Sequence, residues 1–308
     1  MKDTRLKMVE GQVRLDQLSF LSTIQLIITE SEEADNIKGF GSGFFLMHND
    51  NTYFVTADHL VHLKDHDSAN ETGQRLGIDL IPQIITNIKV KDQLASVTIP
   101  TSGYYYLTGY QIGREDFETD KDFLQGILKV LNNKVDINDE SLPLGARIAD
   151  FVDIAITEIK QPLKCLPLNN KVVDFEKNVI IEEGTPKIFL CTSSIADIDD
   201  KHTYIVSGTI NNDLKNSCTI YRENVCHNGL QFTEVDTDGN VLLKTPETPN
   251  ILHWEGLSGA PVFNDEGFLV GMLLRGPVSD NIITIAPVKK ILNFIEQINL
   301  QNEVGDHS

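Results

Sequence analysis

The chain has 308 residues, enough for about two domains of ordinary size, and 41% of them are hydrophobic against 23% charged. Asp and Glu outnumber Lys and Arg by 45 to 26, which gives a net charge of −19. This acidity argues against binding to nucleic acid or to anionic membranes, because both attract basic surfaces. We expect a soluble globular protein with a sizeable core.

The cysteines are scattered, and none lies in a C-x-x-C pair: Cys165, Cys191, Cys218 and Cys226. Cys218, Cys226 and His227 lack the short spacings of a structural zinc site, so we expect reduced thiols, no metal and no cofactor. No apolar run is long enough to cross a membrane. Residues 18–28 are interrupted by polar residues and do not resemble a secretory signal. We therefore expect a cytoplasmic protein.

In chain order, the first element is a short amphipathic helix, predicted from the spacing of Val13, Leu15, Leu18 and Leu21. Residues 23–29 (TIQLIIT) then predict a strand. Residues 41–48 and 52–57 are two apolar runs joined by three polar turn residues, 49–51, which predicts a β-hairpin.

Further short strands are predicted at IKVKD, SVTIP, YYYLTGY, DIAITEI, KIFLCT, YIVSGTI, QFTEV, APVF and FLVGMLL. Residues 64–145 are long and mixed and predict strands with inserted loops. Apolar residues at helical spacing predict a C-terminal helix: Val288, Ile291, Leu292, Ile295 and Ile298. Many short strands between turns indicate an all-β sandwich or barrel.

Three segments carry the chemistry. His59 follows a strand in YFVTADHLV, Asp153 begins the alternating strand FVDIAI, and Ser258 lies between glycines in GLSGAPVF. A serine hydroxyl needs an adjacent base to become a nucleophile, and histidine titrates near neutral pH. A buried aspartate would orient the imidazole and stabilise its protonated form. The backbone N–H groups of Gly256 and Ser258 could form an oxyanion hole.

Neighbouring residues have simpler interpretations. Only His59 has the TA-x-H context, so His48 and His62 are not candidates. Asp150 would face the other side of the strand from Asp153. Asp58 is interpreted as a surface or hydrogen-bonding neighbour, and Ser42 in GSG as a turn residue.

Together, TADH, DIA and GLSGAPV resemble the trypsin-like (chymotrypsin-fold) serine peptidases, in particular the intracellular and bacterial branch. The resemblance implies two antiparallel six-stranded β-barrels with the active site between them. It implies an extension at 1–18, a first barrel at 19–157 carrying His59 and Asp153, a second barrel at 158–287 carrying Ser258, and a C-terminal helix and tail at 288–308.

The resemblance also implies substrate-binding positions. Leu274, Arg275 and Gly276 match the strand that pairs with the substrate backbone, and Leu252 matches the floor of the primary specificity pocket. An apolar or small residue is therefore expected before the cleaved bond, with Arg275 favouring an acidic group. Leu257 replaces the aspartate that digestive members use in zymogen activation, so activation by that ion pair is not expected.

The sequence thus predicts a serine endopeptidase that cleaves a protein or peptide, without nucleic-acid or membrane partners. A dedicated substrate in a stress-response or defence system, and a regulatory protein partner, are compatible with it. Two alternatives stay open: a catalytically silent protease-fold module that binds peptides, and a serine esterase. The esterase is disfavoured because its serine usually lies between a strand and a helix.

Overall fold

The computed structural model describes residues 13–30, 37–66, 80–90, 93–101, 103–110, 149–160, 169, 171–173, 176–215, 219–246, 250–277 and 281–305. Its helices are α1 (Leu15–Ser22) and α3 (Val288–Gly305). The strands are β1 (Ile24–Thr29), β2 (Ile37–His48), β3 (Asn51–Thr56), β4 (Ile81–Val90), β5 (Gln93–Pro100), β6 (Tyr105–Tyr110), β7 (Ala149–Glu158), β8 (Val172–Val173), β9 (Val179–Ile181), β10 (Leu190–Cys191), β11 (Thr203–Lys215), β12 (Thr219–Val235), β13 (Val241–Lys244), β14 (Pro261–Asn264), β15 (Leu269–Arg275) and β16 (Ile282–Pro287). The predicted all-β class is confirmed.

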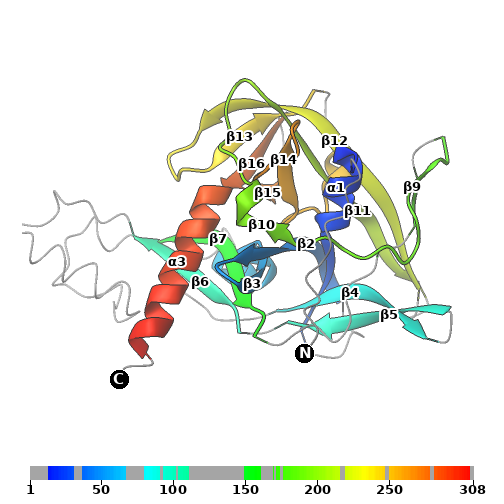
Figure 1. Ribbon diagram of the computed structural model, residues 1–308, viewed down its shortest axis with the longest axis horizontal. Coiled ribbons are helices and arrows are strands. Elements are labelled where there is room, and N and C mark those ends of the chain that lie inside the picture. The colour runs from blue at the N-terminus through cyan, green and yellow to red at the C-terminus, as the bar shows by residue number, and fades with distance from the viewer. Residues whose placement is uncertain are drawn as a thin grey trace, which may run out of the picture.

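The second half of the chain closes into the predicted barrel. Its six strands pair in the order β11-β12-β13-β16-β15-β14, and β11 pairs with β14 to complete the ring. In Figure 1 this barrel forms the upper part of the molecule. The barrel core contains Tyr204, Leu243, Trp254 and Leu257, all at least 95% buried. Closure gives each of these six strands a partner on both sides, although β15 extends past the end of β14. β8 and β9 pair with each other as a separate two-stranded sheet.

The first half forms an eight-stranded sheet, whereas the resemblance implied a six-stranded barrel. The order is β5-β4-β1-β2-β3-β7-β6, and β10 pairs in parallel with β2. Among the described residues, no pairing joins β5 to β6, so the two outer strands remain edges. β10 also lies beyond residue 158, where the second barrel was expected to begin, and yet it belongs to the first sheet.

The predicted hairpin is β2–β3. His48 pairs with Asn51, and the two turn residues between them, Asn49 and Asp50, have positive φ angles of 48° and 65°. A tight turn with positive φ at both positions matches the twist of antiparallel strands. The hairpin therefore ends in a two-residue turn, one residue shorter than expected, and aligns β3 so that its C-terminal end reaches the site.

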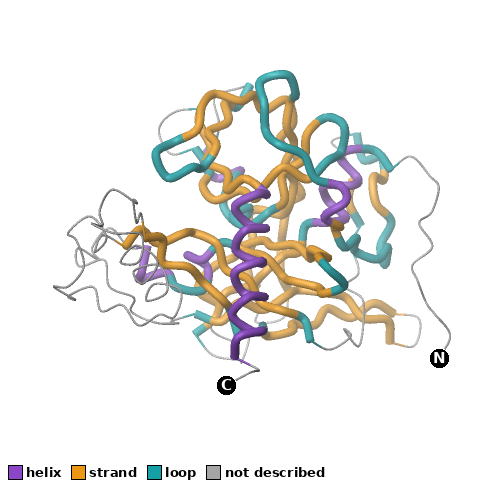
Figure 2. Tube along the Cα trace, turned by 60° about the vertical axis from the view of Figure 1, so that its left-hand side comes forward, coloured by secondary structure: helices purple, strands orange, loops and turns teal. Residues whose placement is uncertain are grey.

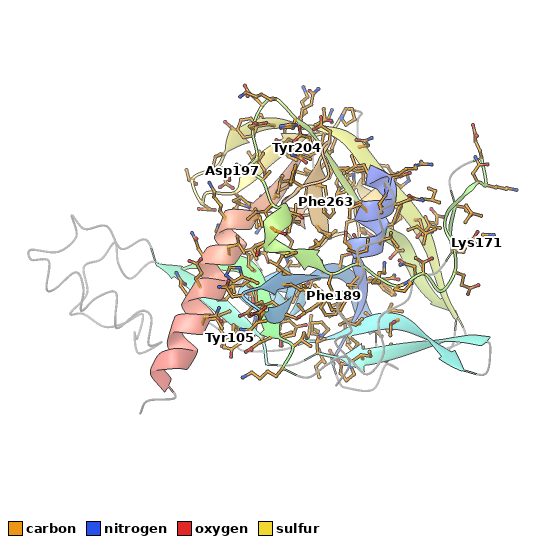
Figure 3. The ribbon with its side chains drawn as sticks, viewed as in Figure 1. Tyr105, Lys171, Phe189, Asp197, Tyr204 and Phe263 are labelled. Atoms are coloured by element: carbon orange, nitrogen blue, oxygen red, sulfur yellow. The ribbon has the colours of Figure 1, made fainter. Side chains whose placement is uncertain are left out.

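Helix α3 packs along both halves. Figure 2 shows it running from the barrel down across the strands of the first sheet. Its buried residues Ile291, Phe294 and Ile295 share one core with Phe45 of β2 and Phe263 of β14. Figure 3 labels Phe263 together with Phe189, whose ring stacks on Phe45 at 4.4 Å between centroids. The two halves are therefore joined by a common apolar core.

Helix α1 begins and ends close to where it was predicted, and it contacts the barrel. The Ser207 hydroxyl of β11 donates to that of Ser19 at 2.7 Å, and Thr23 donates to the Ser207 carbonyl at 3.0 Å. The Lys187 ammonium donates to the carbonyls of Phe20 and Thr23, at the C-terminal end of α1. Among the described residues, neither α1 nor α3 combines the length and apolarity that crossing a membrane requires.

Candidate active site

His59 lies on a short 3-10 turn, Asp58–Leu60, directly after β3. Strand β7 pairs with β3 in antiparallel register, with Thr56 opposite Ala155. This register brings Asp153, two residues before Ala155, alongside the turn. Two residues that lie far apart in the sequence thus meet at one end of the sheet.

The Asp153 carboxylate holds His59 at three points. The imidazole Nδ1 lies 3.0 Å from Oδ1 and 2.9 Å from Oδ2, and the backbone N–H of His59 donates to Oδ1 at 3.0 Å. The side chains are 22% and 8% exposed. With Nδ1 occupied by the carboxylate, Nε2 is left for a substrate or a nucleophile.

Both pKa values reflect this pairing. Burial by itself lowers the pKa of His59, but the charge of Asp153 and its hydrogen bond outweigh burial and hold that pKa above 6.5. Burial would raise the pKa of Asp153, yet the charge and hydrogen bonds of His59 keep it below 3.8. The pair therefore favours an ionised carboxylate beside a basic imidazole.

Ser258 lies on a tight turn, residues 254–260, which we call the Ser258 turn. Gly256 and Gly259 have φ angles of +95° and +89°, a conformation that side chains disfavour. Leu257 between them is fully buried in the barrel core. The backbone N–H of Gly259 donates to the carbonyl of Leu273 in β15 at 2.7 Å. Leu257 therefore holds the turn by apolar packing, at the position where an aspartate would be needed for the activating ion pair.

Some of the backbone N–H groups of the Ser258 turn are hydrogen-bonded and others are not. The N–H of Leu257 donates to the carbonyl of Trp254 at 3.1 Å. Within the described part of the chain, the N–H groups of Gly256 and Ser258 have no hydrogen-bond acceptor. Backbone N–H groups without a protein acceptor are the donors that an oxyanion hole uses, so these two remain the candidates.

The Ser258 hydroxyl donates to the carbonyl of Leu274 at 3.0 Å. No hydrogen bond joins it to His59 among the described residues. A hydrogen bond between Ser258 and His59 would require the serine hydroxyl to turn away from Leu274, and catalytic hydrogen bonds often form only when substrate binds.

The predicted substrate-binding residues lie around this turn. Leu274 is buried, while Arg275 at the end of β15 is exposed. A Cβ on Gly276 would come within 2.7 Å of Trp254 Cβ, and the Trp254 ring stacks on His227 with 3.8 Å between centroids. Leu252 lies on the 3-10 turn Ile251–His253 and is 53% exposed among the described residues.

Asp58 was underestimated from the sequence. It is fully buried, and its two carboxylate oxygens bind His62 Nδ1 and His66 Nε2, each at 2.7 Å. It is therefore a hydrogen-bonding residue and not a surface one. The spacing of Asp58, His62 and His66 at four-residue intervals is the sequence signal for this cluster. The described residues contain no group of three or more His, Cys, Asp or Glu arranged to hold a metal ion.

Ser42 was predicted to be a turn residue, and this was wrong. It lies in β2, is fully buried, and contacts the Ser258 turn through both its amide and its hydroxyl. The GSG pattern is typical of turns, which is why it was misread. Only the meeting of the first sheet with the barrel gives Ser42 these partners.

No protein-family model and no curated protein matches the chain. Among solved structures, tobacco etch virus protease is 11% identical with a TM-score of 0.41, over 95% of this chain and 82% of that one. A serine endoprotease from Yersinia pestis is 11% identical with a TM-score of 0.39, over 92% of this chain and 64% of that one. Tobacco vein mottling virus protease is 7% identical with a TM-score of 0.37, over 92% and 83%.

The structural neighbours are chymotrypsin-fold proteases of serine and cysteine type. The chain spans less than two thirds of the Yersinia pestis protein. Identities and TM-scores this low describe fold at most, so any reaction has to be inferred from the site itself.

Proposed function

We propose that the protein is a serine endopeptidase in which Ser258 is the nucleophile, His59 the general base and Asp153 the residue that orients it. The observation that carries this proposal is the His59–Asp153 pair, which occupies Nδ1 and leaves Nε2 for the serine. A further support is proximity: a Cβ on Gly259 would lie 2.8 Å from Thr56 Oγ1, three residues before His59.

The reaction begins when the Ser258 hydroxyl turns from Leu274 to His59. Its oxygen attacks the carbonyl carbon of the substrate while its proton passes to Nε2. The N–H groups of Gly256 and Ser258 stabilise the oxyanion. The C–N bond then breaks, Nε2 returns the proton to the departing amine, and the acyl group stays on Ser258. A water molecule, activated by His59, releases the acid and restores the serine.

A peptide substrate fits the barrel edge beside the turn. Strand β14 pairs with β15 only as far as Met272, and residues 259 and 260 bind both backbone groups of Leu273, so residues 274–275 extend past these partners. An extended peptide can add to such an edge through backbone hydrogen bonds, which is a common mode of recognition. The exposed Arg275 lies on this edge and favours an acidic substrate side chain. A small ester lacks the backbone amides that this strand pairing requires.

The silent binding module is the second candidate, because the Ser258 hydroxyl is hydrogen-bonded to Leu274 and not to His59. In a silent module this bond would persist with peptide bound. In a peptidase it is exchanged for the bond to His59, so reactivity of the serine separates the two.

The test is covalent labelling with a fluorophosphonate probe, with the adduct located by mass spectrometry. We expect labelling of the wild type at Ser258 and none of Ser258→Ala. His59→Ala should lower the labelling rate by at least about 10⁴-fold, because triad residues act as a unit. Peptide-library cleavage then separates a peptidase from an esterase. A folded wild type that is neither labelled nor able to cleave any peptide would contradict the proposal.

A further inference from the structure

Each polar group of Ser42 has a hydrogen-bond partner, and two of the three bonds cross between the two halves. Its backbone N–H donates to the carbonyl of Ser258 at 2.7 Å, and its hydroxyl donates to the carbonyl of Gly256 at 2.7 Å. Its own carbonyl accepts from the Thr56 hydroxyl at 2.7 Å. Ser42 is fully buried, so each of these bonds is shielded from water.

The two hydrogen bonds from Ser42 to the Ser258 turn end on the carbonyls of Gly256 and Ser258, the residues whose N–H groups are unused. The Gly256 carbonyl belongs to the peptide unit that joins residues 256 and 257. The N–H of that unit is held by Trp254, so Ser42 and Trp254 hold the same unit at opposite ends. The neighbouring units carry the unused N–H groups of Gly256 and Ser258, and their directions depend on the unit between them.

The contact is too close to be incidental. A Cβ on Gly259 would lie 1.9 Å from the Ser42 carbonyl oxygen, so the turn rests directly on β2. A Cβ on Gly208 of β11 would lie 3.6 Å from the Ser42 hydroxyl, so the barrel also lines this side of it. The donor thus comes from the first sheet and the acceptors from the segment joined to the barrel.

We propose that Ser42 is a positioning residue: its hydroxyl holds the Gly256 carbonyl so that the N–H groups of Gly256 and Ser258 stay directed at the substrate. This inference rests on the proposed peptidase function. It explains how the oxyanion site is preformed without the ion pair that Leu257 cannot make. It also makes the reactivity of the turn depend on the contact between the two halves.

The test compares Ser42→Ala with Ser22→Ala. Ser22 is also fully buried, and its hydroxyl also donates to a backbone carbonyl at 2.7 Å, that of Leu18 in α1. Both variants lose one buried hydroxyl, but only the first lies against the turn. Ser42→Cys keeps the shape with a weaker donor and serves as the conservative variant.

We expect Ser42→Ala to lower the maximal fluorophosphonate labelling rate by about 100-fold, with little change in the probe concentration that gives half of it. Ser42→Cys should fall between it and the wild type, and Ser22→Ala should label normally. Amide hydrogen exchange at Leu257 should be faster in Ser42→Ala alone. This second readout reports the peptide unit itself and does not depend on catalysis.

Normal labelling of a folded Ser42→Ala, or unchanged exchange at Leu257, would overturn the inference and leave the peptidase assignment standing. An equal loss in Ser22→Ala would also overturn it, because general destabilisation would then be the cause. Failure of the wild type to label would instead remove the peptidase assignment, and the role of Ser42 in catalysis with it.

Discussion

At the scale of single residues, the His59–Asp153 pair sets the chemistry. The same interaction acts on stability. The folded pKa of His59 lies above 6.5. The stability that the fold gains from protonated His59 is therefore complete below pH 6.5 and is lost as pH rises through the folded pKa. The folded pKa of Asp153 lies below 3.8. The stability that the fold gains from ionised Asp153 is therefore complete above pH 3.8 and is lost as pH falls through the folded pKa. The pair therefore stabilises the fold most between these values.

The raised pKa of His59 predicts the pH dependence of activity. Because only the neutral imidazole can accept the serine proton, labelling of Ser258 should increase with pH, with a midpoint above 6.5. Asp153→Asn removes the charge that raises this pKa, so the His59 titration, followed by NMR, should move to lower pH. The labelling rate should fall by about 10⁴-fold. A His59 titration that is unchanged in Asp153→Asn would show that the pair does not control this pKa.

Asp58 holds in place the 3-10 turn that carries His59. A fully buried carboxylate is costly unless it is paired, and Asp58 binds two imidazoles. It is adjacent to His59 in the chain, and it lies in the same 3-10 turn. The His62 ring in turn packs edge-on against Tyr106 of β6 at 4.4 Å between centroids. The turn that carries His59 is therefore held to β6 through Asp58 and His62.

At the scale of elements, the Ser258 turn is held by close packing. Leu257 enters the barrel core, where a Cβ on Gly208 would lie 2.6 Å from its Cδ2. Gly259 rests on the backbone of β2. Neither contact depends on charge, so the geometry of the turn should be insensitive to salt.

Gly259→Ala tests this packing. The added methyl group meets the Ser42 carbonyl oxygen at 1.9 Å, in addition to the strain of φ +89°. Gly239→Ala is the matched control, because Gly239 has φ +74° and nothing within 4 Å of its Cβ position. The control should lose about 1–3 kcal/mol of unfolding free energy from backbone strain alone. Gly259→Ala should lose more and should also lose labelling. Equal losses in urea denaturation would mean that the turn does not rest on β2.

At the scale of the whole molecule, the two halves share a core. Buried residues of β2, β14 and α3 belong to one apolar cluster, and α3 crosses both halves (Figure 2). The Tyr53 hydroxyl of β3 also donates to Asn299 of α3 at 2.7 Å. Because the proposed nucleophile and base lie in different halves, the shared core is what keeps them together.

Ile295→Ala tests the coupling. Ile295 is fully buried in the shared core, so its truncation should cost about 2–5 kcal/mol. Trp254, the single tryptophan, lies in the barrel core and reports on that half by fluorescence. We expect its unfolding midpoint in urea to fall together with that of the far-ultraviolet circular dichroism. Glu296→Ala, exposed on the same helix, should leave both midpoints unchanged. A shift in only one signal would mean that the halves unfold independently.

Local patterns predicted much of this architecture. The β2–β3 hairpin, helix α3 and the short helix α1 each follow from apolar spacing and turn residues that act over a few positions. The six-stranded second barrel was predicted through the family resemblance. The width of the first sheet was not, because β10 joins β2 from the far side of the boundary at residue 158. Pairing between distant segments leaves little trace in a local pattern.

The sequence by itself determined which residues could do the chemistry: His59, Asp153 and Ser258 stand out because their neighbours are distinctive. Only the tertiary structure decided that Asp153 is hydrogen-bonded to His59 and Ser258 to Leu274. It also decided that Ser42 is buried against the Ser258 turn and Asp58 against His62. The reason is physical. Residue type and local turns are encoded nearby, whereas burial and hydrogen-bond partners depend on surfaces that meet only when the two halves pack.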